Sequence, residues 1–419
     1  MSDETTLSRP RLAQGTLLLA SMLTIMAGAT ISPALPAIQR EFANAPNAGV
    51  LVGLVLTMHG LFIAVGSPLI GALTDRYGRR WLLLVSTVLY ALAGGSGFVL
   101  DSLIAILASR AVLGLAVAGV MVTVTALITD YYEENRRDTI LGRQGAFMSI
   151  GGVVLLPLAG VLADIGWRVP FLVYTVALVL LPAMVFTLPE PNRRDPTGNR
   201  PTSLDDLHQT LAQFPLRTLA LIATLGLVGQ IIFYMVPVQI PFYLETRTGA
   251  SGTVIGTALA ASTGAGGVAS LLYGRIRRSL SVIGIVALTF GFMSIGYTVI
   301  GVSGTVRVVV VGLAVAGAGS GFLLTNLNAW IAAVTPEAVR GRALSVLTST
   351  FFLGQFLSPL VIQPVSDTLG LGTTFAGVGV VLGGGAVVFA LAAVYTTPPT
   401  ESDSEFPEHP RNSPEKASD

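Results

Sequence analysis

A short charged segment between two long apolar runs is the part of this sequence whose residue types and spacing are most specific. Its glycine and charged positions are Gly71, Asp75, Arg76, Gly78, Arg79 and Arg80. An aspartate can accept hydrogen bonds from the N-terminus of a neighbouring helix, where the helix dipole favours an anion, and arginines bind carboxylates or lipid phosphates. Glycines allow a tight turn or a close helix approach. The spacing predicts a moving joint between helices; the alternative is a basic loop that only fixes membrane topology.

One arginine lies inside an apolar run. Arg110 is followed by Gly114 and Ala118 at successive i+4 positions, which places all three on one helix face. A charged side chain in a membrane span costs roughly 2.5–3.5 kcal/mol on insertion scales, so it normally faces a cavity or a partner. The alternative is that Arg110 snorkels to lipid headgroups from a position near the extracellular end of its helix.

Groups that could carry a proton are scarce. No Asp or Glu lies deep in any apolar run, and His59 is the only deep side chain that titrates near neutral pH. Asp130, at the end of the run that contains Arg110, is the other candidate. We expect proton coupling to use His59 or Asp130, with Arg110 as a modulator. The alternative for His59 is a hydrogen bond between helices.

Several kinds of site are missing from the sequence. It contains no Gly-Lys-Ser/Thr phosphate loop, no nucleophile–base pair, no metal-ligand cluster and no cysteine. ATP-driven transport and catalysis are therefore not expected, and neither is a cofactor, a bound metal or a disulfide. The net charge of +1 gives no reason to expect binding to nucleic acid.

The elements that must position these residues follow from composition. Apolar residues make up 52% of the 419-residue chain and charged residues 11%, whereas a soluble domain carries about 25% charge. A span needs about 20 apolar residues, so the chain has room for roughly twelve helices. The runs do not alternate apolar with polar residues, which favours helices over the strands of a β-barrel. The expected spans are 12–34, 48–72, 81–99, 102–129, 140–163, 168–188, 216–243, 251–273, 281–300, 306–330, 342–364 and 371–396.

A polar stretch divides the chain into two halves that echo each other. The turn after the eighth expected span repeats the arginines of the 71–80 segment without its aspartate. The predicted fold is an all-α integral membrane protein with twelve helices in two pseudo-symmetric six-helix bundles, and repeated halves of this kind place a binding site at their interface. The expected parts are an N-terminal bundle at 1–188, a cytoplasmic linker at 189–215, a C-terminal bundle at 216–397 and a disordered cytoplasmic tail at 398–419.

Arginine placement sets the expected orientation. Alternate loops carry clusters of arginine, such as that at 76–80, whereas the intervening loops carry single arginines. By the positive-inside rule, the arginine-rich loops face the cytoplasm. We therefore expect a multi-pass protein of the plasma or inner membrane of the cell, with both termini and the linker in the cytoplasm.

The charged segment resembles the signature of the major facilitator superfamily, G-x-x-x-D-R-x-G-R-R/K, and the resemblance extends over the whole chain. In that family the segment helps to latch the two halves in the outward-facing state. The resemblance implies that Asp75 meets the start of the eleventh span, near Gly341 and Arg342. It also implies that Arg79 pairs with an acid at the end of the fourth span, a place that Asp130 occupies.

Two further segments resemble the drug:proton antiporter group of this superfamily. Gly152, Pro157 and Gly160 match its fifth-span motif G-x-x-x-G-P-x-x-G-G, although two glycines of that motif are replaced. Arg110 and Gly114 fit the fourth-span pattern R-x-x-x-G, which the family links to proton transfer. Small residues permit close helix packing, and a proline kinks its helix by removing a backbone hydrogen bond. Ordinary packing of small residues is the alternative for the fifth span.

The resemblance also indicates which spans line the cavity, namely the first, fourth, seventh and tenth. Amides, a phenol and a hydroxyl on these spans could orient a ligand with few polar contacts. Hydrogen bonds between helices, without ligand contact, are the alternative for each. The expected cavity residues are Thr24, Gly28, Gln230, Tyr234, Asn326 and Asn328.

Together these features predict a secondary active transporter that works by alternating access between two halves. The favoured function is export of an amphipathic small molecule coupled to proton influx. The alternatives are a proton-independent facilitator or uptake carrier for a neutral metabolite, and a transporter-like sensor. The expected partners are a small-molecule substrate, protons and membrane lipid, and the expected oligomeric state is a monomer.

Overall fold

The computed structural model describes residues 9–191 and 215–395, which form helices and contain no strand. Within these residues, twelve helical stretches are long and apolar enough to cross a membrane. The predicted fold class, an all-α membrane protein, is therefore confirmed. Residues 192–214 of the expected linker and the expected tail at 398–419 lie outside the described residues.

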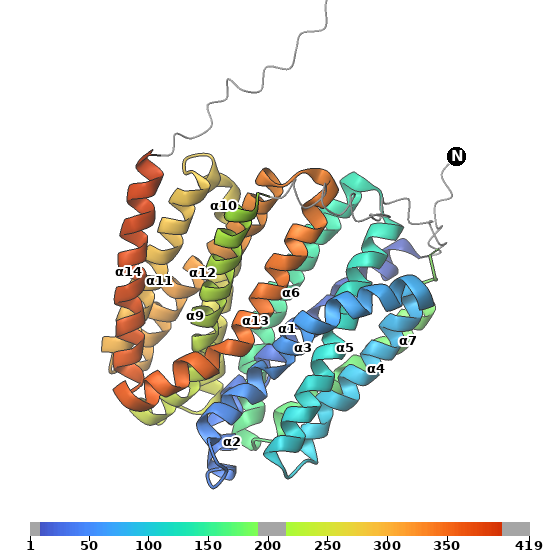
Figure 1. Ribbon diagram of the computed structural model, residues 1–419. Coiled ribbons are helices and arrows are strands. Elements are labelled where there is room, and N and C mark those ends of the chain that lie inside the picture. The colour runs from blue at the N-terminus through green and yellow to red at the C-terminus, as the bar shows by residue number, and fades with distance from the viewer. Residues whose placement is uncertain (1–8, 192–214, 396–419) are drawn as a thin grey trace, which may run out of the picture.

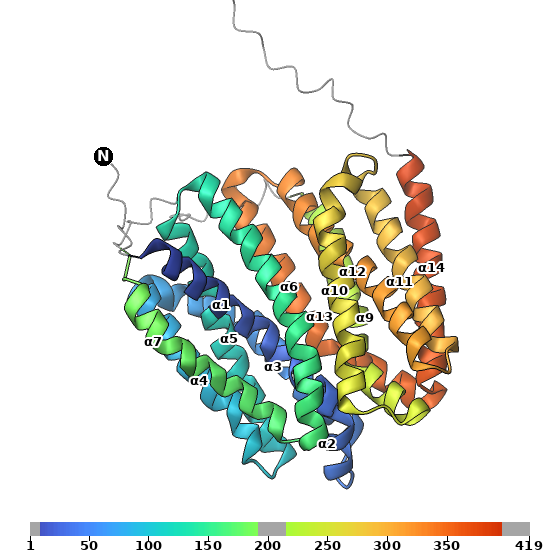
Figure 2. The same cartoon turned by 180° about the vertical axis from the view of Figure 1, so that it is seen from behind.

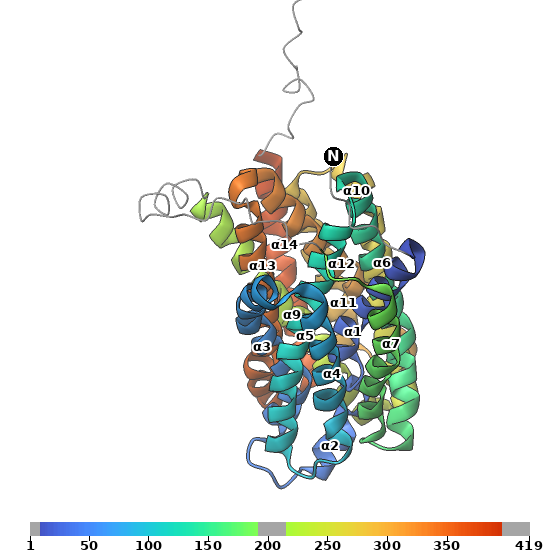
Figure 3. The same cartoon turned by 90° about the vertical axis from the view of Figure 1, so that its right-hand side faces the viewer.

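The N-terminal half forms one group of helices, with α3, α4 and α5 at the front of Figure 3. Its first span is interrupted near Thr30 because Pro33 and Pro36 cannot donate backbone hydrogen bonds to a continuous helix. Its elements are α1 (Pro10–Ala29), η1 (Ser32–Ala34), α2 (Leu35–Glu41), α3 (Ala48–Tyr77), α4 (Arg79–Gly95), η2 (Ser96–Phe98), α5 (Leu103–Tyr131), α6 (Glu134–Ile165), η3 (Val169–Val176) and α7 (Ala177–Thr187).

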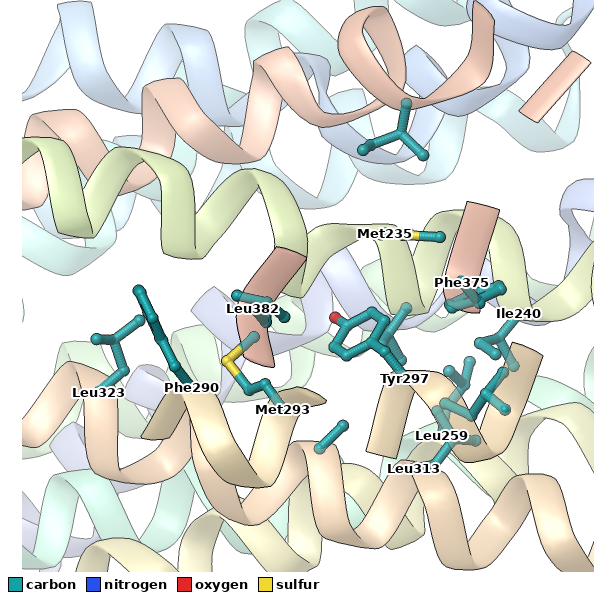
Figure 4. Close-up of a cluster of buried hydrophobic side chains, with 14 of the residues drawn as sticks. Met235, Ile240, Leu259, Phe290, Met293, Tyr297, Leu313, Leu323, Phe375 and Leu382 are labelled. Carbon is teal, nitrogen blue, oxygen red and sulfur yellow. The ribbon is translucent and has the colours of Figure 1, made fainter. Parts of the chain in front are cut away.

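The C-terminal half forms a second group beside the first (Figures 1 and 2). Buried aromatic, methionine and aliphatic side chains of α9, α11, α12 and α14 form its core; Phe290, Met293 and Tyr297 of α11 lie among them (Figure 4). Its elements are α9 (Leu216–Thr248), α10 (Gly252–Arg277), α11 (Val282–Val302), α12 (Val306–Val334), α13 (Glu337–Leu369) and α14 (Leu371–Tyr395).

The charged segment at 71–80 is mostly helical, which corrects the expectation of a loop. Helix α3 continues through Asp75 to Tyr77, and α4 begins at Arg79. Only Gly78 separates them, with φ of +99°, a conformation that glycine adopts without a steric penalty. No proline or glycine lies between Gly71 and Gly78, so the helix extends past the apolar run. The joint is therefore a one-residue turn between two long helices.

The two ends of the bundle differ, and we name them by their residues. The termini face holds Arg9, Gly78 and Tyr395, where α1 begins, α3 meets α4 and α14 ends. In Figure 1 the end of α14 lies at the top and the turn between α3 and α4 lies at the right. The opposite face holds the turns at Asn44 and Gly249 and lies lowermost.

Two helix pairs, α3–α13 and α6–α10, form the main contacts between the halves. A Cβ atom on Gly53 would lie 2.7 Å from Pro359 Cβ, and one on Gly60 would lie 2.8 Å from the carbonyl oxygen of Phe352. On the second pair, a Cβ on Gly160 would lie 2.2 Å from the carbonyl oxygen of Gly252. These glycines let the helix backbones touch in the part of the bundle nearer the opposite face.

The same helices are apart nearer the termini face. Gly71 lies on the same side of α3 as Gly60, three turns further along, and Gly142 lies on the same side of α6 as Gly160. A Cβ on Gly71, Gly142 or Gly341 would have no described heavy atom within 4 Å. The bundle is therefore closed toward the opposite face and open between its halves toward the termini face.

Candidate functional site

Arg79 and Asp130 form an ion pair through Arg79 Nε and a carboxylate oxygen of Asp130. The pair joins the start of α4 to the last turn of α5, so it lies within the N-terminal half. Both side chains are largely buried, with exposed fractions of 23% and 17%. The pairing that the family signature implies is thus present, and its role in latching stays a prediction.

Glu190 is a functional candidate that the sequence reasoning missed. Its two carboxylate oxygens accept hydrogen bonds from the backbone N–H groups of Arg79 at 2.7 Å and Arg80 at 2.9 Å. These are the first donors of α4, which have no partner inside their own helix. A Cβ on Gly78 would lie 2.8 Å from Glu190 Oε1, so the turn residue must be small. The sequence signal that could have identified Glu190 is its position between two prolines, directly after the last apolar run of the N-terminal half.

Of the remaining charged residues of the signature, Arg80 donates through Nη2 to the carbonyl oxygen of Val185 at 2.6 Å, within the N-terminal half. Asp75 and Arg76 are exposed, and the Arg76 guanidinium lies 5.5 Å from the centroid of the Tyr77 ring. Gly341, near which Asp75 is expected to bind, has no described heavy atom within 4 Å of its Cβ position. The expected contact between Asp75 and the start of α13 therefore stays a prediction for a state in which these helices close.

Arg110 is completely buried, which excludes snorkelling to lipid headgroups. Its Nη2 donates hydrogen bonds to the carbonyl oxygens of Ala93 at 2.9 Å and Gly94 at 2.8 Å. These carbonyls belong to the last turn of α4, where the helix dipole favours a cation. The guanidinium carbon also lies 5.1 Å from the ring centroids of both Phe171 and Tyr174. Arg110 thus caps α4 and stacks between aromatic rings; a role in proton coupling stays a prediction.

His59 joins the two halves at the closed end of the space between them. The amide Nε2 of Gln355, on α13, lies 2.9 Å from His59 Nε2 on α3, and both side chains are buried. An amide nitrogen only donates, so this geometry requires an unprotonated acceptor at His59 Nε2. Gln355 is a second residue that the sequence reasoning missed, because nothing in its neighbours distinguishes it.

Further polar groups gather around this bridge. A Cβ on Gly28 of α1 would lie 3.5 Å from both His59 Nε2 and the hydroxyl oxygen of Tyr234 on α9. One turn before Tyr234, the Cβ of Gln230 would lie 2.9 Å from a Cβ on Gly354, the neighbour of Gln355. The structure therefore brings together Gly28, Gln230 and Tyr234 of the expected cavity residues with His59.

The other expected cavity residues are placed differently. Thr24 is half-buried and donates its hydroxyl to the carbonyl oxygen of Ser21 at 2.7 Å. Asn326 is fully buried; its amide donates to the carbonyl oxygen of Val282 at 2.9 Å and accepts from the Tyr273 hydroxyl at 3.2 Å. Its polar atoms are thus used inside the C-terminal half. Asn328 is exposed on the other side of α12.

A cavity of about 440 Å³ lies along α5 near the termini face. The hydroxyls of Thr125 and Thr129 donate to backbone carbonyls one turn earlier, at 2.9 and 3.0 Å, so toward the cavity they offer only acceptor lone pairs. The mixture of methyl, thioether and hydroxyl groups suits an amphipathic molecule. The lining residues are Arg79, Met121, Val122, Thr125, Ala126, Thr129 and Asp130.

The fifth-span motif lies at the contact between α6 and α10. A Cβ on Gly152 would lie 2.8 Å from Thr263 Cγ2, and a Cβ on Gly256 of α10 would lie 3.2 Å from the Cα of Pro157. Gly160 contacts the backbone of Gly252 in the same way. The glycines of the motif therefore let the two halves pack closely through most of the span.

Gly160→Val is expected to weaken this contact strongly, because the added side chain overlaps the backbone of α10. Overpacking of a close contact costs about 1–3 kcal/mol, or roughly a fivefold to hundredfold loss of the closed arrangement. The measurement is disulfide formation between cysteines at Ser149 and Gly267, since Ser149 Cβ lies 3.3 Å from a Cβ on Gly267 and the chain has no other cysteine.

The matched control is Gly384→Val on α14, where a Cβ would have no described heavy atom within 4 Å. This control should oxidise as fast as the parent pair. Equal rates for Gly160→Val and the parent would contradict the packing argument.

Comparison with known proteins agrees with this geometry. A sequence model described as Major Facilitator Superfamily matches residues 17–248 and 227–417. The chain belongs to this superfamily. Its fold is similar to the crystal structure of a D-xylose-proton symporter, with a TM-score of 0.76 at 17% identity over 91% of this chain and 97% of that one.

Two curated relatives of this superfamily member carry names that refer to multidrug resistance or multidrug efflux. Multidrug resistance protein 1 of Bacillus subtilis (strain 168) is 28% identical over 42% of this chain, and the chain spans only 46% of that relative's length. Multidrug efflux protein YfmO of the same strain is 25% identical over 92% of this chain and 94% of that protein.

Proposed function

We propose that this superfamily member exports an amphipathic small molecule and couples that export to inward movement of protons. The observation that carries the proposal is the unequal closure of the halves, since α3–α13 and α6–α10 touch near the opposite face and part near the termini face. Arginine-rich turns lie at the termini face, so we assign that face to the cytoplasm. The structure then corresponds to an inward-facing state of alternating access.

The substrate class follows from the groups around the central bridge. His59, Gln230, Tyr234 and Gln355 supply hydrogen-bond donors and acceptors without a carboxylate, and the α5 cavity adds hydroxyl and apolar groups. A site of this kind suits a neutral or weakly charged amphipathic compound better than it suits a cation. The efflux name of the relative that matches nearly the whole chain supports export as the direction.

His59 is the group that we propose to carry the proton, with Asp130 as the second candidate. A protonated His59 presents an N–H at Nε2, which the amide nitrogen of Gln355 cannot accept. Protonation therefore requires the Gln355 amide to turn so that its Oε1 accepts from His59 Nε2, and it places a positive charge at a buried contact, which favours separation of α3 from α13. The Arg110 guanidinium interacts electrostatically with His59, and the Tyr234 hydroxyl, from the other half, lies beside the same glycine, Gly28.

The signature segment is the proposed latch of the outward-facing state. Closing the termini face would bring the helix side that carries Gly71 and Asp75 against the start of α13, whose N–H groups could bind the carboxylate. The pair Arg79–Asp130 and the cap that Glu190 gives to α4 hold the adjoining turn in position.

The proposed function is tested with inside-out vesicles and a fluorescent amphipathic dye. An acidic lumen should accelerate dye uptake into the lumen, and a protonophore should abolish that acceleration. Dye flux that does not change with the pH gradient would indicate the proton-independent facilitator. Dye binding without flux would indicate the sensor.

A further inference from the structure

The two halves are joined at the opposite face by an aspartate that caps a helix of the other half. Asp164, in the last turn of α6, accepts hydrogen bonds from the backbone N–H of Gly252 at 2.6 Å and of Thr253 at 3.0 Å. The hydroxyl of Thr253 donates to the same carboxylate at 2.6 Å. Gly252 and Thr253 are the first two residues of α10.

The cap supplies hydrogen-bond acceptors that α10 lacks at its N-terminus. The first N–H groups of a helix have no acceptor within the helix. The N-cap residue Ser251 accepts only from the N–H of Val254, at 3.4 Å. Asp164 supplies acceptors for the two preceding donors, and its negative charge lies at the positive end of the α10 dipole. The N-terminus of α10 is therefore completed by the N-terminal half, and only while the halves touch.

We infer that Asp164 is a positioning residue that holds the opposite face shut and so biases the protein toward the state open at the termini face. This inference uses the alternating-access part of the proposed function and is independent of proton coupling. Opening the opposite face must part α6 from α10, because Gly160 and Gly252 are in backbone contact one turn away. Asp164 then loses all three hydrogen bonds at once.

A second polar contact lies near the same edge. Arg40 lies in the last turn of α2, and its Nη1 is 2.5 Å from Glu245 Oε1 on α9. The two side chains are 64% and 31% exposed, so water and salt screen the pair and it contributes little. Asp164 is exposed as well, but its contact differs because two of its three directed hydrogen bonds come from backbone N–H groups that have no acceptor within α10.

The chain offers a control with similar chemistry on the same face. Asp101 pairs with Arg168 at 2.5 Å, and both residues belong to the N-terminal half. Loss of this pair removes an exposed aspartate contact without changing what joins the halves. A general effect of a lost surface charge would appear in both aspartate variants, whereas an effect on closure would appear only at Asp164.

The test uses two single-cysteine reporters in a chain that has no cysteine of its own. Val238→Cys reports on the opposite face, because Val238 of α9 is 1% exposed and packs among residues of the N-terminal half. Ser345→Cys reports on the termini face, because Ser345 of α13 is exposed there, on the side of the helix that meets α3 further along. The measurement is the rate of modification by a hydrophilic maleimide in purified protein.

In each reporter background, Asp164→Asn should raise labelling of the Val238 cysteine about twofold to fivefold, the size expected for a charge at a helix N-terminus, and lower labelling of the Ser345 cysteine. Thr253→Val should change each labelling rate in the same direction as Asp164→Asn does, but by a smaller factor. It provides the test if the Asp164→Asn protein does not fold. Asp101→Asn should change neither rate.

Opposite changes at the two reporters are what a shift between states requires. If Asp164→Asn and Thr253→Val leave both rates at the parent value, or raise both together as local loosening would, the inference is wrong. Neither reporter needs substrate or a pH gradient, so absence of proton-driven flux in vesicles would overturn the coupling and leave this result intact.

Discussion

Arg110→Leu is expected to lower the stability of the folded protein by about 1–3 kcal/mol. The side chain is fully buried and donates to the carbonyl oxygens of Ala93 and Gly94. Leucine removes the donor from the Gly94 carbonyl, and a buried acceptor left unpaired costs about 1–3 kcal/mol. The Ala93 carbonyl still accepts from the Ser96 hydroxyl at 2.9 Å. The guanidinium also fills the space between the rings of Phe171 and Tyr174. The measurement is the thermal unfolding midpoint of the purified protein in a single detergent.

Two variants separate the cap from a simple effect of removing an arginine. Arg110→Lys keeps the charge but loses the planar stack on the aromatic rings and the fixed donor geometry of the guanidinium, so its midpoint should lie between those of the leucine variant and the parent. Arg168→Leu removes an arginine that also lies over an aromatic ring, that of Trp167, but is partly exposed. It should change stability by less than about 1 kcal/mol. A midpoint for Arg110→Leu equal to that of Arg168→Leu would contradict the structural role assigned to Arg110.

The positions of the spans could be predicted because each depends on local composition alone. Runs of about 20 apolar residues must be helical in a membrane, since backbone groups there need partners within the segment. The ends of helices were predicted less well. Helix α3 continues to Tyr77 because the charged residues after its apolar run are compatible with a helix, and only Gly78 ends it.

Partners of isolated polar residues could not be predicted, because they depend on how far each helix is rotated and shifted against its neighbour. Gln355, Glu190 and Asp164 each stand alone in the sequence, without a motif. Their hydrogen bonds reach residues at least 88 positions away, the separation for Asp164 and Gly252. Asn326 shows the converse, since an amide on a helix expected to line the cavity is used entirely within its own half. The side-chain types indicated that these residues form hydrogen bonds. Which partners they bind is determined by the packing of the helices.

His59→Gln is expected to abolish uphill, pH-driven dye accumulation while leaving downhill flux. Glutamine can still exchange a hydrogen bond with Gln355, so the contact between α3 and α13 remains possible. It cannot gain or lose a proton at the pH of the assay, so the state of the bridge no longer follows the pH gradient. The ratio of dye across the vesicle membrane should fall to about 1, the value reached without a driving gradient. The measurement is that ratio in inside-out vesicles with an imposed acidic lumen.

The controls decide whether the effect belongs to the bridge. His208→Gln changes a histidine that lies outside the described residues and outside the apolar runs, and it should accumulate dye as the parent does. Gln355→Leu keeps the titratable group but removes its partner, so proton binding loses its link to the contact between the halves and accumulation should also fall. Parent-like accumulation in His59→Gln would exclude His59 as the carrier. The same assay on Asp130→Asn would then test the remaining candidate, whose carboxylate pairs with Arg79 at the edge of the α5 cavity.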